Sequence, residues 1–547
     1  MLRPKAKAEK EEEMSGERTI PKLNDSYDIV VIGAGNGGLA AALQIAVKGG
    51  KPLLLEQHNL PGGFATSFVR GRFEFEASLH ELAGIGPASD KGGVRAFLED
   101  ECKVDIDWVP VPEAYRLILT DDNLDITLPF GVQNYIEAIE LEVPGSREPM
   151  NKYIELCRDL KDTIGLLGKL NEKPDITKLA ESLKNLPAAF GDAASMPVKI
   201  GNFMKTLAYT VDEVTKTFNI PAKAMKILYP YWCYLGLPTS RMSFTIWAVM
   251  LLEYLERGAY IPRMRSHELA SAMEARILEL GGQVEYNTRV EKIIVENNQV
   301  AGVETASGDV IKTQHVICNA SPTLAYNKLI SPISAVPPAA YKNVNARKHG
   351  GAGFVVYLGL NAPMEEIGIR DYGLFISKNM DTDDIYFSMG KAALNNMQAT
   401  ICLNNAIPYC SPPGTSIISM TTLYKSEAWH TLTPGDYFKL KNKIASDMID
   451  QFEKATHTRI RDHIEEIEVA TPVTFARYTG THGGGVYGYE PEPWDSVIPR
   501  ILSQKDECYI KGLMFTGGYS QMCHGYSSAL MSGQATAGAA LRKMGVK

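Results

Sequence analysis

The fold of this chain is set by one stretch near its start, YDIVVIGAGNGGLAAALQIAVKGGKPLLLEQ at residues 27–57. Residues 29–32 are apolar and mostly β-branched, which predicts a buried strand. Residues 39–47 are strong helix formers, and the glycine pair at 49–50 is typical of a helix end. Residues 53–55 form a second short apolar run. The stretch therefore predicts a strand–helix–strand unit whose two strands run parallel.

Three glycines form a G-x-G-x-x-G pattern between the first strand and the helix. Such glycines allow a tight turn, let backbone approach a pyrophosphate, and let the helix pack closely on the strand. The helix N-terminus then offers free N–H groups to the phosphates. An acid that ends the second strand lies at about the spacing expected for a ribose-binding residue. The residues predicted to bind a dinucleotide here are Gly33, Gly35, Asn36, Gly37, Gly38 and Glu56.

Two further glycine-rich segments favour FAD over NAD as this dinucleotide. The Pro-Gly-Gly turn at 61–63 offers backbone N–H groups without side-chain bulk, which suits an extended cofactor. Near the C-terminus an apolar run at 513–515 ends in Thr-Gly-Gly, and a loop leads into a helix of small residues. The N-terminus of that helix can point N–H groups at a flavin or its phosphates. These segments add Gly62, Gly63, Phe64, Gly517, Gly518, Tyr526 and Ser527 to the predicted FAD-binding residues.

With these motifs in place, the chain resembles the phytoene desaturase-like flavoproteins, which include carotenoid desaturases, carotenoid cis-trans isomerases and retinol saturases. The resemblance spans nearly the whole chain, and its two ends are the most specific parts. It implies FAD-dependent chemistry on C=C bonds of an apolar substrate, and a backbone contact of Val290 with the adenine. Beside the N-terminal fingerprint, it rests on FEFEASLH at 73–80, VEKIIVENNQVAGVETASGDVI at 290–311, TPVTFARYTGTHGGGVYG at 471–488, and TGG followed by GYSSALMSG within 516–533.

The order of elements predicts an α/β fold in which distant segments share one sheet. The family fold implies a discontinuous Rossmann-type FAD-binding domain of the GR type and a second α+β substrate domain with a sheet floor and a helical cover. Residues 91–262 are expected to be mostly helical. We assign 25–90, 263–325 and 470–547 to the FAD-binding domain, 91–262 and 326–469 to the substrate domain, and 1–24 to a disordered tail.

Two positions depart from the family pattern. The family usually has a Tyr-Pro-x-Gly-Gly element where this chain reads YIPRMRS at 260–266, without a glycine pair. The family's frequent aspartate after F-x-F is Glu76 here. We therefore expect substrate handling to differ from the family around these positions.

Flavin carries out hydride chemistry itself, so the protein has to supply position, electrostatics and any proton. His80 and Glu81 follow a strand that leads from the Gly-Gly turn toward the flavin, and we expect one of them to donate a proton; a capping or ion-pair role is the alternative. His524 and Tyr526 lie at the C-terminal flavin loop and are expected to line the site. His482 lies in a glycine loop, where a surface histidine is the simpler interpretation.

Two apolar stretches are candidates for contact with a lipid-like substrate. The run ILYPYWCYLG at 227–236, followed by FTIW at 244–247, is typical of core but also fits the lining of a long apolar tunnel. Residues 190–207, with Lys199 and Lys205, fit a peripheral contact with a bilayer surface. The longest apolar stretch, 244–252, falls short of the roughly 20 residues that cross a membrane.

Composition narrows the class of protein. The chain has 547 residues and a net charge of −8, which gives no basic surplus for nucleic acid. Its 8 cysteines are scattered without a C-x-x-C pair or metal-ligand spacing, which predicts a reducing compartment, no disulfides and no metal site. There is no apolar segment typical of a secretory signal, and we expect a cytoplasmic protein, with peripheral contact to a membrane as an open alternative. No second G-x-G-x-x-G opens a helix, so no dedicated NAD(P)H domain is expected.

The sequence thus favours an FAD-dependent oxidoreductase or isomerase that saturates, desaturates or isomerises C=C bonds of a polyene, a retinoid or an unsaturated fatty acid. Two alternatives stay open: oxidation of C–N bonds as in flavin amine oxidases, and an FAD-binding protein without turnover. Substrate identity, reaction direction, electron partner and oligomeric state stay open as well.

Overall fold

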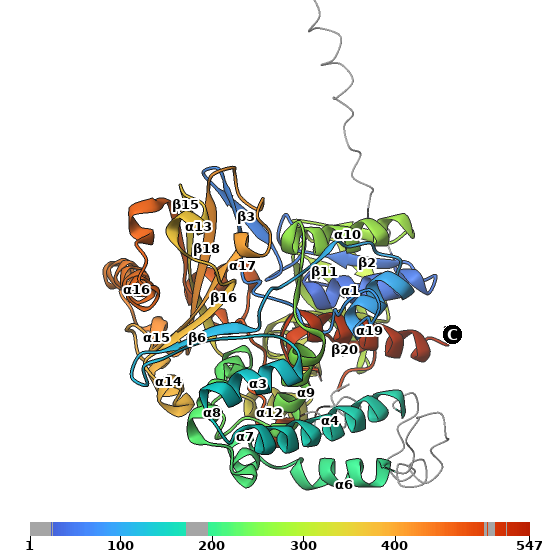
Figure 1. The fold of residues 1–547 in the computed structure, drawn as a ribbon. Helices are drawn as coiled ribbons and strands as arrows, with labels where there is room; N and C mark the ends of the chain where they lie inside the picture. Colours follow the sequence, from blue (N-terminus) through green and yellow to red (C-terminus); the bar gives the residue numbers. More distant parts are fainter. Residues whose placement is uncertain are drawn as a thin grey trace, which may run out of the picture.

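The computed structural model describes residue 23 and residues 26–170, 195–496, 500, 509–520 and 522–546. Two large sheets lie side by side, and a layer of helices closes the molecule beneath them (Figure 1). The tail predicted for 1–24 lies outside the described residues except for Leu23. No helix within the described ranges is long and apolar enough to span a bilayer.

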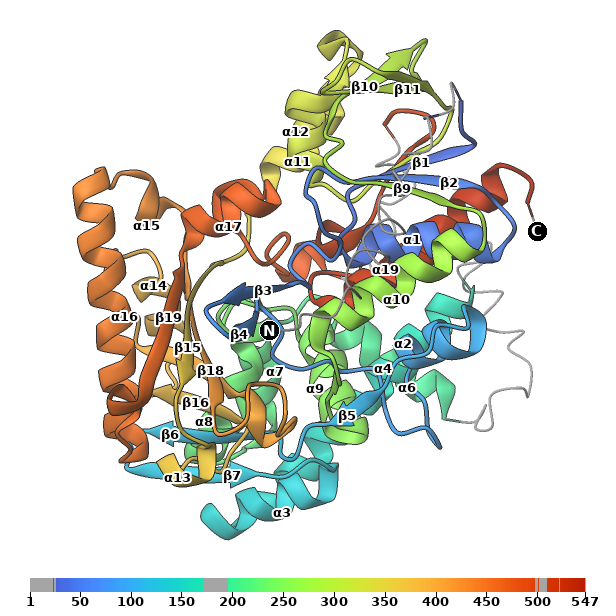
Figure 2. The ribbon, with the colours of Figure 1, turned by 90° about the horizontal axis from the view of Figure 1, so that it is seen from above.

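Three distant segments of the chain build one five-stranded sheet. All its neighbouring strands are parallel. Helix α1 packs against both α10 and α19 beside this sheet (Figure 2). The predicted α/β fold, with one sheet made from distant segments, is confirmed. The strand order is β20 (Leu513–Phe515), β13 (Val316–Cys318), β1 (Ile29–Ile32), β2 (Pro52–Leu55) and β9 (Gln283–Glu285), and the helices are α1 (Asn36–Val47), α10 (Arg265–Glu279) and α19 (Tyr526–Lys543).

Both faces of this sheet are buried, which explains why β1 is apolar at every position. Ile29 and Val31 pack in the same core as α1, whereas Val30 and Ile32 pack against a second sheet. That sheet has four strands in the order β12 (Val310–Lys312), β11 (Gln299–Thr305), β10 (Val290–Glu296) and β14 (Ile330–Ser331).

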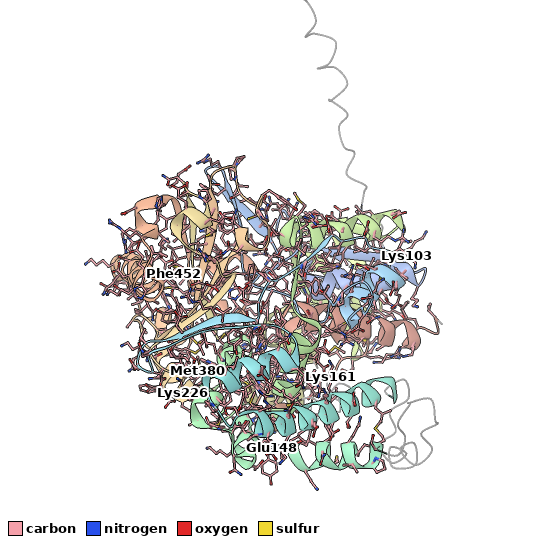
Figure 3. The ribbon with its side chains drawn as sticks, in the orientation of Figure 1. Lys103, Glu148, Lys161, Lys226, Met380 and Phe452 are labelled. Carbon is pink, nitrogen blue, oxygen red and sulfur yellow. The ribbon has the colours of Figure 1, made fainter. Side chains whose placement is uncertain are left out.

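The third sheet has seven strands and forms the floor of the other half of the molecule. Its pairs are antiparallel except for β16 with β6. Helix α16 (Pro434–Thr456) covers one face, where Phe452 packs with Phe354 of β15 (Figures 1 and 3). The opposite face, with Val355 and Tyr357, joins the central core. The strand order is β19 (Ile464–Ala470), β15 (Ala352–Leu360), β18 (Ser416–Tyr424), β17 (Met397–Cys402), β16 (Gly373–Ser377), β6 (Tyr115–Leu119) and β7 (Leu124–Leu128).

A helical layer covers the space between the two halves. Lys161 of α4 pairs with Glu253 at 2.7 Å and with Glu256 at 2.9 Å, and both carboxylates lie on α9 (Figure 3). Helix α6 packs against both α4 and α9. The layer consists of α3 (Val132–Glu142), α4 (Arg147–Leu170), α6 (Met196–Thr206), α7 (Val211–Thr215), α8 (Ala222–Leu228), η3 (Pro230–Tyr234) and α9 (Phe244–Arg257).

The remaining elements are short and join these layers. The hairpin of β3 and β4 reaches the floor sheet, because Arg70 and Arg72 pair with Glu468 and Glu465 of β19. The other strands are β3 (Ser67–Arg70), β4 (Phe73–Glu76), β5 (Trp108–Pro110) and β8 (Tyr260–Pro262). The other helices are α2 (Gly93–Arg95), α11 (Pro322–Leu324), α12 (Pro338–Ala346), α13 (Met364–Ile367), α14 (Thr382–Ser388), α15 (Glu427–His430), α17 (Pro472–Thr479), η1 (Ala96–Glu101), η2 (Lys216–Phe218), η4 (Ala325–Leu329), η5 (Ile333–Ala335), η6 (Leu403–Asn405), η7 (Ile460–His463), η8 (His482–Gly484), η9 (Pro493–Asp495) and η10 (Gly517–Tyr519).

The helical expectation for 91–262 is incomplete, because this segment also contains β5 to β8. Strands β6 and β7 complete the edge of the floor sheet, so their pairing partners lie far away in sequence. Helix α17 packs on β15 and β19 of the floor sheet, although it follows residue 470. The domain bounds given above therefore stay a prediction.

Candidate active site

The N-terminus of α1 is open to a ligand. Gly35 is its N-cap residue, no side chain caps it, and no acid lies in its first turn. Asn36 is buried, and its Oδ1 atom has no hydrogen-bond partner among the described residues. A buried helix N-terminus without a cap leaves N–H groups for an anion. This end of α1 therefore fits the phosphates of a dinucleotide.

The first turn requires glycine because neighbouring segments approach its backbone too closely for a side chain. A Cβ atom on Gly37 would lie 2.6 Å from the Cα of Gly517 and 2.7 Å from Asn319 Oδ1. A Cβ atom on Gly38 would lie 1.9 Å from the carbonyl oxygen of Gly33. Gly33 itself has a φ of +93°, a conformation that side chains disfavour. The ends of β1, β13 and β20 thus meet α1 in a cradle that no side chain of the first turn fills.

Glu56 lies at the end of β2, where the sequence places it. Its carboxylate accepts the N–H of Ala34 at 2.6 Å and the N–H of His58 at 2.8 Å. The acid is therefore held against the first glycine turn. Its contact with a ribose stays a prediction, as does the contact of Val290, which begins β10 opposite Thr305.

The Pro-Gly-Gly turn lies directly beside the first glycine turn. The N–H of Gly62 donates to the carbonyl of Ala34 at 2.8 Å, and Gly62 pairs with Gly35 in an isolated bridge. Gly62 and Gly63 both have positive φ, at +109° and +63°. Phe64, which follows, packs against Phe475 with ring centroids 5.8 Å apart. The structure therefore brings the two predicted glycine segments together.

The C-terminal segment completes the same site. Gly517 has a φ of +83°, and its N–H donates to Ser532 Oγ at 3.0 Å. The phenol of Tyr526 donates to the carbonyl of Phe64 at 2.8 Å, and Ser527 Oγ donates to the carbonyl of Ala83 at 2.6 Å. These bonds fix the start of α19 against residues from the N-terminal part of the chain. The hydroxyls of both residues already have protein partners there.

Sequence reasoning missed Asn319. This residue follows β13 directly, and its side chain lies within 4 Å of Cβ positions built on Gly33, Gly35, Gly37, Gly38 and Gly517. Its amide also lies 3.5 Å from the carbonyl oxygen of Gly33. The available signal was its position, because a polar residue at the carboxyl end of a parallel strand lies where such sheets bind ligands. We predict that Asn319 holds the cradle open.

A cavity of about 1330 Å³ adjoins the start of α19. It reaches from the floor sheet at Val355 and Thr421 along α19, where both Ser527 and Arg542 line it. These two residues lie on one helix that rises 1.5 Å per residue, so the cavity extends for about 22 Å. Much of its wall is apolar, and the apolar side chains include Val94, Ile164, Ile246, Val249, Met250, Val355, Leu423, Phe475 and Met531.

The aromatic run serves both of the roles considered for it. Tyr234 and Leu235 line the cavity, as does Ile246 from the following stretch. Trp232 and Trp247 are instead fully buried in the core. The run thus forms one wall of the cavity and the packing behind that wall.

His80 and Glu81 both line the cavity. The Nε2 atom of His80 lies 3.1 Å from Thr421 Oγ1, and Glu81 Oε1 accepts the phenol of Tyr234 at 3.2 Å. Burial lowers the pKa of His80 to about 4. Burial also raises the pKa of Glu81 to about 8, against an opposing effect of the Tyr234 hydrogen bond. At neutral pH both groups are uncharged, and only Glu81 carries an acidic proton.

His524 lines the same cavity, and its position is set by η3 and Tyr487. Its Nε2 lies 3.2 Å from the carbonyl oxygen of Tyr234, and the ring stacks on Tyr487 at 4.4 Å between centroids. A carbonyl only accepts, so Nε2 carries the hydrogen. Burial lowers the pKa of His524 to about 3, so the ring is neutral. His482 instead is exposed, stacks on His349 at 4.4 Å, and does not belong to the described cavity wall.

The two positions that depart from the family pattern, residues 260–266 and Glu76, contact each other. Arg265 has a φ of +68° at the start of α10 and is buried. Its guanidinium pairs with Glu74, and its Nε lies 3.8 Å from Glu76 Oε1. The N–H of Ser266 also donates to Glu76 at 3.2 Å. The altered YIPRMRS segment and the altered acid are therefore parts of one buried ionic contact.

A family model described as flavin-containing amine oxidoreductase matches residues 37–541. The chain belongs to this family. Among its relatives, it is 24% identical to an all-trans-retinol 13,14-reductase of Danio rerio, over 95% of this chain and 86% of that protein. It is 25% identical to a chloroplastic prolycopene isomerase of Daucus carota, over 85% and 72%. Cyclohexylamine oxidase from Brevibacterium oxydans has the same fold, with a TM-score of 0.57 at 15% identity over 95% of this chain and 100% of that one.

These relatives confirm the predicted resemblance to flavoproteins of the desaturase, isomerase and saturase group. As a member of the flavin-containing amine oxidoreductase family, the chain is an FAD-dependent enzyme. The uncapped α1 terminus, the cradle without Cβ atoms and the unpartnered Asn36 Oδ1 fit that cofactor. The individual roles of the site residues stay predictions.

Proposed function

We propose that this protein is an FAD-dependent oxidoreductase or isomerase that acts on C=C bonds of an elongated apolar polyene or retinoid. The single observation that carries the proposal is the cavity beside α19. It is long, it is apolar over much of its wall, and its wall near the floor sheet carries an uncharged carboxylic acid, Glu81. The relatives named for retinol reduction and prolycopene isomerisation support the same substrate class.

The electrostatics of the wall near the floor sheet favour C=C chemistry over amine oxidation; the charged residues that line the cavity, Glu253, Arg542 and Lys543, belong to α9 and to the end of α19. An ammonium substrate would be stabilised by a carboxylate that stays ionised, whereas burial keeps Glu81 protonated at neutral pH. His80 and His524 are neutral and offer no charge either. Transfer of an apolar polyene from water into such a cavity is favourable, because the substrate has few polar groups to desolvate. We therefore place amine oxidation behind action on C=C bonds.

When bound, FAD supplies hydride-transfer chemistry. The first glycine turn, Asn319 and the start of α19 would hold this cofactor. The apolar wall orients the chain of double bonds and excludes water. Glu81 gives its proton to one carbon of the double bond and ends the step as a carboxylate. In saturation this proton stays in the product. In isomerisation it lowers the bond order that restricts rotation, and it returns to Glu81 once the bond has rotated.

We also propose that α6 brings the cavity to a membrane surface from which apolar substrates enter. Val198 and Met204 of α6 are 63% and 62% exposed, and Lys205 lies at the same helix. Helix α6 packs on α4 and α9, which provide Ile164 and Met250 to the cavity wall. Residues 190–194 of the predicted contact lie outside the described residues. Seven free buried cysteines among those described support a cytoplasmic location.

The proposal is tested by incubating the purified yellow protein, with and without oxygen, with a panel of polyenes, retinoids, unsaturated fatty acids and amines. Mass spectrometry and chromatography separate the products. A gain of two hydrogens shows saturation, a loss shows desaturation, and an unchanged mass with altered retention shows isomerisation. Release of peroxide from amines without change in any polyene would overturn the proposal.

A further inference from the structure

Tyr234 contacts three residues that the sequence analysis singled out as candidate catalytic groups. Its phenol donates to Glu81 Oε1 at 3.2 Å. Its backbone carbonyl accepts from His524 Nε2 at 3.2 Å. Its ring meets the ring of His80 edge-on, with centroids 5.9 Å apart. One residue of η3 thus joins the segment after β4 to the loop that precedes α19.

Aromatic packing fixes the position of Tyr234 itself. Its ring centroid lies 5.3 Å from that of Tyr231, 5.7 Å from Tyr254 and 6.0 Å from Phe375. The preceding carbonyl, of Cys233, accepts the phenol of Tyr487 at 2.5 Å. These neighbours come from η3, α9, β16 and the segment after α17, so little rotamer freedom remains. A hydroxyl held this rigidly can fix the orientation of the carboxyl that it contacts.

We propose that Tyr234 is a positioning residue for the proton donor of the reaction proposed above, on which this inference rests. Because the phenol donates to Oε1, the proton of the neutral carboxyl lies on Oε2. The O–H bond at Oε2 breaks as the proton passes to one carbon of the double bond, whose electron pair forms the new C–H bond and leaves the other carbon cationic. In isomerisation the added proton returns to Glu81 after rotation about the former double bond. In saturation the cationic carbon would accept a hydride from reduced flavin, and water would then reprotonate Glu81.

The same hydrogen bond acts on the carboxylate that proton transfer leaves behind. A hydrogen bond to an ionised acceptor is roughly twice as strong as a neutral one. Tyr234 therefore favours the ionised form of Glu81 and opposes part of the effect of burial on its pKa. The other titratable groups facing Glu81 are Tyr231, Tyr254, Glu113, Tyr372, Cys233 and His80. Of these, Glu113 raises the pKa of Glu81, and a hydrogen bond with Tyr231 lowers it by less than the one with Tyr234.

The test compares Tyr234→Phe with Tyr115→Phe in the flavin-loaded enzyme. Tyr115 belongs to the same aromatic cluster, at 5.0 Å from Tyr231, and its phenol contacts Tyr135 and the carbonyl of Ile227. It does not belong to the described cavity wall. We expect Tyr234→Phe to lower kcat about tenfold with KM unchanged, and to move the alkaline fall of the pH profile to higher pH. Tyr115→Phe should change neither.

A second readout does not depend on turnover. The infrared band of the protonated Glu81 carboxyl is the band that Glu81→Gln removes, and its titration is followed with pH in the holoenzyme. We expect the midpoint to rise in Tyr234→Phe and to stay in Tyr115→Phe. An unchanged midpoint in Tyr234→Phe would overturn the inference. A raised midpoint in a protein that converts no polyene would leave the Tyr234–Glu81 contact standing and refute the proposed function instead.

Discussion

The first glycine turn and the cavity wall around Glu81 are built in opposite ways. The turn is made of backbone, and residues 33–38 that form it are contiguous in sequence. The wall is made of side chains from Glu81, Tyr234 and His524, which lie hundreds of residues apart. A site made of backbone can be recognised from local sequence, because only glycine tolerates the close approach of neighbouring backbone. A side-chain site is specified by tertiary packing and cannot be located from local sequence alone.

Replacement of Glu81 in the cavity wall should have the largest effect on kcat and should leave FAD binding at the first glycine turn unchanged. Glu81→Gln keeps the shape of the side chain and removes its proton, so kcat on a converted polyene should fall roughly 1000-fold. Bound flavin per protein should stay unchanged, because Glu81 lies outside the glycine cradle. The exposed Glu296 gives a matched control, Glu296→Gln, that should retain full activity. A fall in kcat of less than fivefold for Glu81→Gln would show that Glu81 is not the proton donor.

A substitution in the first glycine turn should instead weaken the binding of FAD. Gly37→Ala places a Cβ atom 2.6 Å from the Cα of Gly517, where backbone cannot yield cheaply. We expect FAD to bind roughly 100-fold more weakly, which corresponds to an overpacking cost of up to ~3 kcal/mol. Titration of the apoprotein with FAD measures the effect. Gly201→Ala on α6, with open space around the added Cβ, is the control and should bind FAD normally. Equal affinity of the two variants would contradict the close approach.

The smallest effect concerns the exposed face of α6. The double variant Val198→Asp, Met204→Asp places two charges on the exposed face of α6 and should lower binding to anionic phospholipid vesicles about fivefold, as measured by sedimentation. Leu141→Asp on α3 is the control, because Leu141 is 77% exposed but lies on another helix. If the double variant sediments like the control, α6 is not the membrane contact.

The sequence alone predicted those elements that are determined by local sequence patterns. The strand of β-branched residues and the glycine pattern predicted β1, α1 and β2, with Glu56 at the end of β2. The sequence motifs also assigned the N-terminal glycine turns and the start of α19 to one cofactor, and the hydrogen bond from Tyr526 to Phe64 holds these two segments together. The family resemblance predicted a flavoenzyme, which the family match confirms.

Other features depend on contacts that no local pattern encodes. Strands β6 and β7 lie in a segment whose proline-broken helices dominate the pattern, and they form only because the edge of the floor sheet offers partners. The side chain of Asn319 lies against five glycines from two distant segments. Sequence reasoning could name His80 and Glu81 together but could not choose between them. The choice follows from burial, which lowers one pKa and raises the other.

The pH dependence of kcat tests the account most directly. Glu81 must be protonated to donate, and burial raises its pKa to about 8, so the acid form is present below that pH and is lost above it. We predict a rate that is level between about pH 6 and 7 and falls as the pH rises through about 8, and we predict that Glu81→Gln abolishes this fall. A rate that increases through pH 8, or a fall that persists in Glu81→Gln, would contradict a proton held on Glu81.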